Sequence, residues 1–217
     1  RWEAAGALAW LALAAAGAEP FRRCERAGLL GWSASSLMLD WHLGMVETED
    51  GRPRALGPAD ALTLARAWLA PAAAREPSTV LLAAGFLTDV LDGPIARARA
   101  PTRLGRDLEG LADAYFGIAA AAGLLRARRL PRAVAALELG RVTVGLVGAM
   151  AVWFGRAAPP SGAALRAGRA LTPVRAAGLL AASAERRRLG TALSAAGALA
   201  SMGLAVRALL GRPHESG

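Results

Sequence analysis

Acidic side chains are concentrated between residues 89 and 113, where the sequence reads DVLDGPIARARAPTRLGRDLEGLAD. On a helix, Asp89 and Asp92 share one face because they are three residues apart. Glu109 and Asp113 share a face in the same way, because they are four residues apart. A proline and a glycine between the two pairs favour a turn. We therefore expect the two acidic faces to meet across an antiparallel pair of helices.

Four converging carboxylates repel one another unless divalent cations lie among them. All-oxygen ligand sets select hard ions such as Mg²⁺, Mn²⁺ or Ca²⁺, and two bound ions can hold a pyrophosphate. Gly93 permits close approach of the backbone, and Arg97 can donate to phosphate oxygens. Together these residues indicate a phosphoryl-transfer site. The alternative is a buried ion-pair network of the acids with the arginines at positions 97, 99, 103 and 106.

The composition favours a membrane protein as the setting for this site. Hydrophobic residues make up 54% of the 217 residues, and mean hydropathy is +0.34. The net charge is +9, from 26 basic residues, all of them arginine, against 17 acidic residues. Basic loops beside apolar segments are typical of membrane proteins, so we expect a lipid bilayer rather than a nucleic acid as the partner. A single cysteine excludes an intramolecular disulfide.

Apolar stretches recur along the whole chain and predict an all-α, polytopic integral membrane bundle. Only two of them approach the roughly 20 residues that cross a bilayer unaided, so the others are expected to meet in a polar interior. An Ala-rich soluble bundle is the alternative, but the stretch 133–155 has only Glu138 and Arg141 as charged residues. The stretches are 4–18, 27–46, 61–74, 79–91, 110–125, 133–155, 171–184 and 190–210.

A polar segment at residues 47–59 divides the chain into an N-terminal helical extension with its linker, residues 1–57, and a transmembrane domain, residues 58–217. Residues 1–19 have some features of a signal peptide, but Glu3 favours an additional helix. The tryptophans, Trp10 and Trp32 among them, suit membrane interfaces.

The acidic stretch resembles the signature of the CDP-alcohol phosphatidyltransferases, D-x-x-D-G-x-x-A-R followed by G-x-x-x-D-x-x-x-D. Weaker similarity extends the resemblance over about residues 58–210. It includes PADALTLAR at 58–66, with Asp60 where the family usually has asparagine, and Gly168-Arg169-x-x-Thr172. Two departures are Glu109 at the third acidic position and a spacer one residue short. Asp107 is a rival for that position, although it points to another side of a helix.

The resemblance implies six core helices and transfer from a CDP-linked lipid, typically CDP-diacylglycerol, to a small alcohol, with release of CMP. It also implies a homodimer and a site on the cytoplasmic side, although arginine clusters at 97–106, 126–132 and 186–188 leave the orientation open by charge. By correspondence with the motif, Asp113 is the general base. Two Mg²⁺ or Mn²⁺ ions bind Asp89, Asp92, Glu109 and Asp113, and CDP contacts Gly93, Ala96, Arg97, Thr102 and Gly105.

The acceptor is not determined by the motif. A phosphorylated alcohol would suit Arg141, Arg169 and Arg175, whereas the alternative is a Glu138–Arg141 pair within one helix and arginines on lipid headgroups. Arg66 is divided in the same way between the site and a helix end. Two other functions remain open. One is a catalytically degenerate relative that serves as a binding or assembly subunit; the other is an ion transporter, which would not need the phosphate-binding Arg97.

Overall fold

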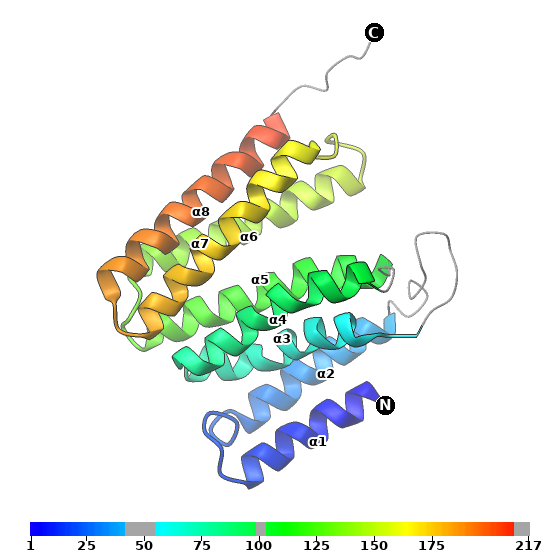
Figure 1. The fold of residues 1–217 in the computed structure, drawn as a ribbon, viewed down its shortest axis with the longest axis vertical. Helices are drawn as coiled ribbons and strands as arrows, with labels where there is room; N and C mark the ends of the chain where they lie inside the picture. Colours follow the sequence, from blue (N-terminus) through cyan, green and yellow to red (C-terminus); the bar gives the residue numbers. More distant parts are fainter. Residues whose placement is uncertain (42–54, 99–102, 211–217) are drawn as a thin grey trace. The chain divides into compact units, whose positions relative to one another are not determined.

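The fold was described from a computed structural model of the chain, which describes residues 1–41, 55–98 and 103–210. Within these residues all regular structure is helical, and no strand occurs (Figure 1). The helices are α1 (Trp2–Ala15), α2 (Glu25–Trp41), α3 (Pro58–Arg75), α4 (Thr79–Ala98), α5 (Arg103–Arg126), α6 (Arg132–Trp153), α7 (Gly162–Ser183) and α8 (Arg187–Leu210).

The predicted all-α class is confirmed, and each apolar stretch lies largely within one helix. Among the described residues, three segments are long and apolar enough to cross a membrane: Leu108–Arg126, Arg132–Trp153 and Arg187–Leu209. These agree with a helical membrane protein, whereas six membrane-spanning core helices remain a prediction. The division at residue 57 also remains a prediction, and most of the expected linker, residues 47–54, lies outside the described residues.

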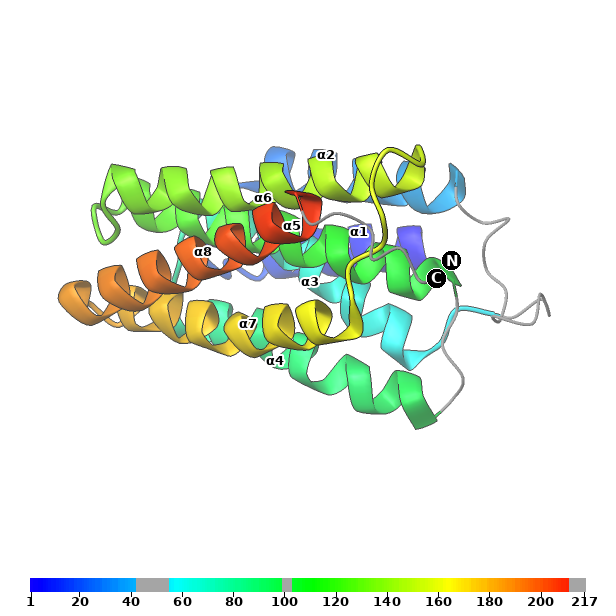
Figure 2. The same cartoon turned by 90° about the horizontal axis from the view of Figure 1, so that it is seen from above.

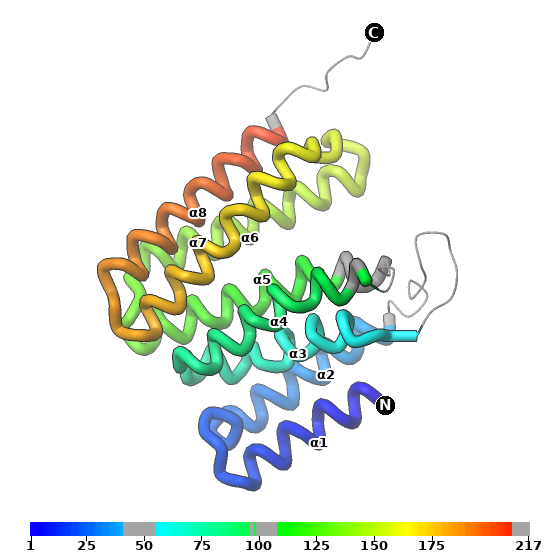
Figure 3. The backbone as a smooth tube through the Cα atoms, in the orientation of Figure 1, coloured from blue at the N-terminus to red at the C-terminus, as the bar shows by residue number. Residues whose placement is uncertain are grey.

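The chain forms two compact units, residues 1–123 and residues 124–217. In the first unit, α2 packs against α1 and α3, and α3 packs against α4; the course of the chain can be followed in Figure 3. The ring of Trp10 is fully buried and lies edge-on to Phe21 and Trp68, with centroids 5.0 and 5.1 Å away. Trp10 and Trp32 therefore pack between helices, and their level relative to a membrane interface remains a prediction.

Two glycines let α5 approach its neighbours in the first unit. A Cβ on Gly85 of α4 would lie 2.1 Å from the ring of Phe116 on α5, and one on Gly123 of α5 would lie 2.2 Å from the carbonyl oxygen of Ala73 on α3. Phe116 is also edge-on to Phe86, at a centroid distance of 5.4 Å. These contacts set α5 against both α3 and α4, the two helices that bring residues to the site.

In the second unit, α8 packs against both α6 and α7 and lies between them (Figure 2). Small residues again permit the close approach. A Cβ on Gly178 of α7 would lie 2.5 Å from the hydroxyl oxygen of Ser194 on α8. One on Gly197 of α8 would lie 2.4 Å from the Cγ atom of Arg175 on α7. Substitution at either position would therefore push α7 and α8 apart.

Candidate active site

Helix α3 carries a buried arginine into the site. The helix begins at Pro58, a residue suited to the first turn because it lacks an N–H that would need a partner. The carboxylate of Asp60 accepts a hydrogen bond from the N–H of Gly57 at 2.7 Å, which caps this end. Two turns further on, the side chain of Arg66 is only 1% exposed. The sequence left two alternatives for Arg66, a role in the site or a position at a helix end. In the structure Arg66 contacts the acidic residues of the site.

Three carboxylates from α4 and α5 converge at this arginine. Oxygen atoms of Asp89, Asp92 and Glu109 all lie within 4.8 Å of one another. Asp92 is buried, Asp89 is half-buried and Glu109 is exposed. Glu109 therefore lies close to the two aspartates of α4, although this chain departs from the usual motif in having a spacer one residue short and glutamate in place of aspartate. The two acidic faces meet across α4 and α5, as their spacing in the sequence predicts.

Arg66 forms ion pairs with all three aspartates of the motif. One guanidinium nitrogen, Nη1, lies 3.2 Å from Oδ1 of Asp89 and also contacts Asp113, while Nη2 donates to Asp92. The side chain of Asp113 is 38% exposed, so its carboxylate is accessible to solvent although it also contacts the buried arginine. Asp113 is not one of the three clustered carboxylates, and its position relative to a metal remains a prediction.

Two threonines complete the surroundings of Arg66. The Thr63 hydroxyl donates to Oδ2 of Asp92 at 3.3 Å, and Nε of Arg66 donates to the Thr88 hydroxyl oxygen at 3.3 Å. Neither role was predicted from the sequence. Thr63 stands in the LTLAR part of the α3 stretch and shares a face with Arg66, which could have indicated it. Thr88 is next to Asp89, and nothing in its spacing indicated a contact with α3.

The donor atoms fit a divalent cation. Ligands of one Mg²⁺ or Ca²⁺ ion lie about 2.0–2.6 Å from it, so two of its oxygen ligands are at most about 4–5 Å apart. The three clustered carboxylates meet this limit. Each carboxylate has two oxygens, so Asp89 and Asp92 can contact Arg66 with one and a cation with the other. Residues Asp89, Asp92 and Glu109 could therefore hold a metal ion.

The residues expected at CDP are only partly described. Gly93 is half-buried in α4, directly after Asp92. Ala96 and Arg97 lie in the last turns of α4 and Gly105 in the first turn of α5, but their side-chain surroundings are not described. Thr102 lies outside the described residues, as does Arg99 of the alternative ion-pair network. The backbone of α4 thus carries Gly93, Ala96 and Arg97 beyond its aspartates, and that of α5 carries Gly105 before Glu109.

A second charged cluster lies within residues 124–217, on α6 and α7. The carboxylate of Glu138, 1% exposed, accepts from Nη2 of Arg175 at 2.9 Å and from Nε of Arg141 at 3.1 Å. The structure thus brings together two of the three arginines expected to bind an acceptor. Arg169 is exposed on α7, six residues before Arg175 and so on another face of the helix.

The sequence indicated the Glu138–Arg141 pair but missed that Glu138 also holds Arg175. These two residues are 37 positions apart, so helical spacing could not reveal the contact. The available signal was the occurrence of charged residues within apolar segments, which require partners. Glu138 is a charged residue within an apolar segment, and it pairs with two arginines, Arg141 and Arg175.

Comparison with known proteins supplies the family. No curated protein and no solved structure is significantly similar to the chain. The family described as CDP-alcohol phosphatidyltransferase matches residues 59–206, which is more than half of the chain and covers α3 to most of α8. The matched region includes Arg66, the clustered carboxylates and Asp113. The chain therefore belongs to the CDP-alcohol phosphatidyltransferase family.

Proposed function

We propose that this protein transfers the phosphatidyl group of CDP-diacylglycerol to the hydroxyl of a small alcohol and releases CMP. Membership of the family supports a transfer from a CDP-alcohol, and the three apolar helices support a membrane setting. The observation that carries the proposal is the convergence of Asp89, Asp92 and Glu109 beside the buried Arg66. We place the site at the cytoplasmic face and the protein in a homodimer as parts of the same proposal.

The acids have two tasks in this reaction. We assign Asp89, Asp92, Glu109 and Asp113 to a site for two Mg²⁺ or Mn²⁺ ions, in accord with the general use of divalent metals by the family. When bound, such ions neutralise the pyrophosphate and the departing CMP. Arg66 holds Asp89 and Asp92 on α4 and Asp113 on α5 in one arrangement, so it positions the carboxylates before any ligand arrives.

Asp113 is suited to accept the proton of the alcohol because its carboxylate reaches solvent, whereas Asp92 is buried. The alcohol oxygen then forms a bond to the lipid-side phosphorus, the bond to the bridging pyrophosphate oxygen breaks, and CMP leaves with that electron pair. Gly93, Ala96, Arg97, Thr102 and Gly105 are assigned to the CDP moiety, since they follow or precede the acids at the ends of α4 and α5.

A phosphorylated alcohol is the acceptor class that the second cluster favours. Arg141 and Arg175 share the single carboxylate of Glu138, so this cluster retains one formal positive charge. A phosphate group would compensate that charge and can be held by two guanidinium groups at once. Arg169, exposed on the same helix as Arg175, is a further candidate for acceptor binding.

The test is CMP release by the purified protein in detergent with CDP-diacylglycerol, Mn²⁺ or Mg²⁺, and a panel of phosphorylated and uncharged alcohols. Asp113→Asn should reduce release by about 10²- to 10⁴-fold, the usual contribution of a general base. Asp40→Asn, on the exposed face of α2, is the matched control and should retain activity. Folding is checked by the unfolding temperature of each variant.

Mn²⁺ binding, followed by electron paramagnetic resonance, provides a readout besides activity. Asp92→Asn should weaken Mn²⁺ binding, whereas Asp40→Asn should not. Metal binding without CMP release from any acceptor would favour a catalytically degenerate relative that acts as a binding or assembly subunit. Glu109→Asp, which restores the usual residue of the motif, would then show whether this position is the cause.

A further inference from the structure

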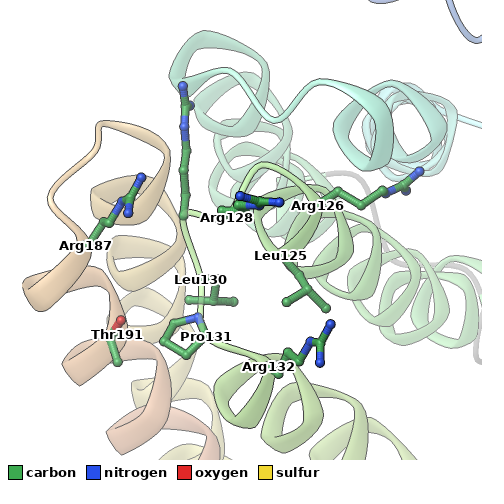
Figure 4. A pocket seen from close by; sticks show the side chains of 9 residues that line it. Leu125, Arg126, Arg128, Leu130, Pro131, Arg132, Arg187 and Thr191 are labelled. Atoms are coloured by element: carbon green, nitrogen blue, oxygen red, sulfur yellow. The ribbon is translucent and has the colours of Figure 1, made fainter.

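A cationic cavity lies within the second unit, at the turn between α5 and α6 and the first turn of α8. Its volume is about 740 Å³. Figure 4 shows Leu125, Leu130 and Pro131 in its middle, with arginine side chains around them and Thr191 on the α8 side. We call it the arginine cavity. It is lined by Leu125, Arg126, Arg128, Arg129, Leu130, Pro131, Arg132, Arg187 and Thr191.

Among the residues that the structure describes, no carboxylate lines the arginine cavity, so none compensates its positive charge from within. Arg129 has protein partners outside it: the carbonyl oxygen of Ser183 accepts at 2.9 Å and the carboxylate of Glu185 at 3.0 Å. These contacts tie the α5–α6 turn to the α7–α8 connection and so hold the two walls together. The other four lining arginines, at positions 126, 128, 132 and 187, are exposed to solvent.

The turn that presents these arginines is well defined. Arg128 has a φ of 56°, in the left-handed region, and its N–H donates to the carbonyl oxygen of Leu125 at 3.0 Å. The N–H groups of Arg129 and Leu130 both donate to the carbonyl oxygen of Leu124. Leu130 itself is buried and anchors the turn from below. The arginines therefore project from a fixed backbone rather than from an open loop.

All three apolar helices of membrane-spanning length begin or end at the arginine cavity. Leu108–Arg126 ends there, and Arg132–Trp153 and Arg187–Leu209 begin there. Residues at the ends of membrane spans lie at the level of the lipid headgroups. The cavity thus combines an apolar floor and a ring of guanidinium groups at the depth where lipid phosphates occur.

We propose that the arginine cavity binds the phosphate of an anionic phospholipid headgroup. Guanidinium groups bind phosphate oxygens through paired hydrogen bonds, and the N-terminus of α8 adds the positive end of a helix dipole. The leucines and Pro131 of the floor suit the apolar acyl chains of a lipid better than they suit a free phosphate ion. This site is distinct from the proposed active site, because the residues that line it include none of those assigned to that site.

The arginine cavity also accounts for the charge distribution in the sequence. The basic clusters at 126–132 and 186–188 lie at ends of the apolar spans, and together with the cluster at 97–106 they leave the orientation open by charge. Bound anionic headgroups would compensate these arginines. The arginines at 126–132 and 186–188 would then belong to a lipid-binding site and would not indicate the orientation of the chain in the membrane.

Native mass spectrometry of the full chain in detergent tests the proposal, with equal concentrations of phosphatidylglycerol and phosphatidylcholine as probes. We expect wild-type protein to retain phosphatidylglycerol preferentially. The double variant Arg128→Gln/Arg187→Gln should bind it about 30-fold more weakly, at roughly a fivefold loss per arginine. The matched control, Arg156→Gln/Arg166→Gln, removes two exposed arginines of the same unit away from the cavity and should bind as the wild type does.

Three results would overturn the proposal. Equal retention of the two lipids by the wild type would do so, and this comparison does not depend on the folding of any variant. An equal loss of phosphatidylglycerol in both double variants would show a general effect of charge. Inorganic phosphate that displaces the lipid at equal concentration would identify a free phosphate as the ligand instead.

Discussion

Replacing Arg66 by glutamine should strongly destabilise the first unit when no divalent cation is present. The arginine is 1% exposed and forms an ion pair with Asp92, which is 5% exposed. Removing one partner of a buried ion pair costs about 3–5 kcal/mol, because the other charge remains buried without compensation. The contact with Asp113 adds little to this figure, because water screens a carboxylate that is 38% exposed.

Divalent cations should reduce the loss. A ligand that binds only the folded state stabilises it by about 2.7 kcal/mol at a concentration 100 times its dissociation constant. Without the guanidinium group, the carboxylates of Asp89 and Asp92 attract a cation more strongly, so the variant should gain more from Mg²⁺ than the wild type does. The difference between variant and wild type should therefore shrink as Mg²⁺ is added.

The assay is unfolding of the detergent-solubilised protein by sodium dodecyl sulfate, followed by tryptophan fluorescence with and without Mg²⁺. Arg22→Gln is the matched control. Its side chain is 63% exposed and pairs with Glu19 at 2.7 Å on the surface, so its loss should stay below about 1 kcal/mol. Equal losses in the two variants, or a loss in Arg66→Gln that Mg²⁺ does not alter, would refute this account of Arg66.

Two further results are expected. Gly123→Ala should lower the free energy of unfolding by about 1–3 kcal/mol, because its Cβ would lie 2.2 Å from a backbone carbonyl oxygen of α3. On the same helix, a Cβ added at Gly110 would have no atom within 4 Å, so Gly110→Ala should raise the free energy of unfolding by about 0.5–1 kcal/mol. If Gly110→Ala proved less stable than Gly123→Ala in the same unfolding assay, the packing of α5 described above would be contradicted. Arg175→Gln should raise the KM for a phosphorylated acceptor at least about tenfold, with little effect on that for CDP-diacylglycerol. Equal KM changes for both substrates would remove Arg175 from the acceptor site.

The helices could be predicted because apolar stretches and breakers determine them locally, but their ends could not. The apolar part of α4 stops at residue 91, yet the helix continues through Pro94 to Ala98. An apolar pattern detects the middle of a helix and not its polar turns. The packing of Trp10 and Trp32 between helices was not predicted, because an indole ring suits a membrane interface and a helix interface equally well. Gly28 and Gly6, which lie against these two rings, were the signal for the helix interface.

The candidate site was predictable to the extent that its residues share a helix. The spacing of Asp89 with Asp92, and of Glu109 with Asp113, is enough to place each pair on one face. The contacts of Arg66 with α4 and α5, and of Glu138 with Arg175, join positions at least 22 residues apart and depend on how the helices pack. Residue types show only that such charges need partners, and the fold decides which partners they find.

The charge of the acidic site favours two cations over one in the proposed reaction. Arg66 carries one positive charge against the three aspartates that it contacts and the clustered Glu109, which leaves the site with a formal charge of minus three. One divalent cation would leave a charge of minus one, which repels the pyrophosphate of the donor. A second would give a charge of plus one, which attracts the two negative charges of that pyrophosphate. Arg66 thus reduces the repulsion among the aspartates and leaves the remaining charge to be balanced by metal and substrate together.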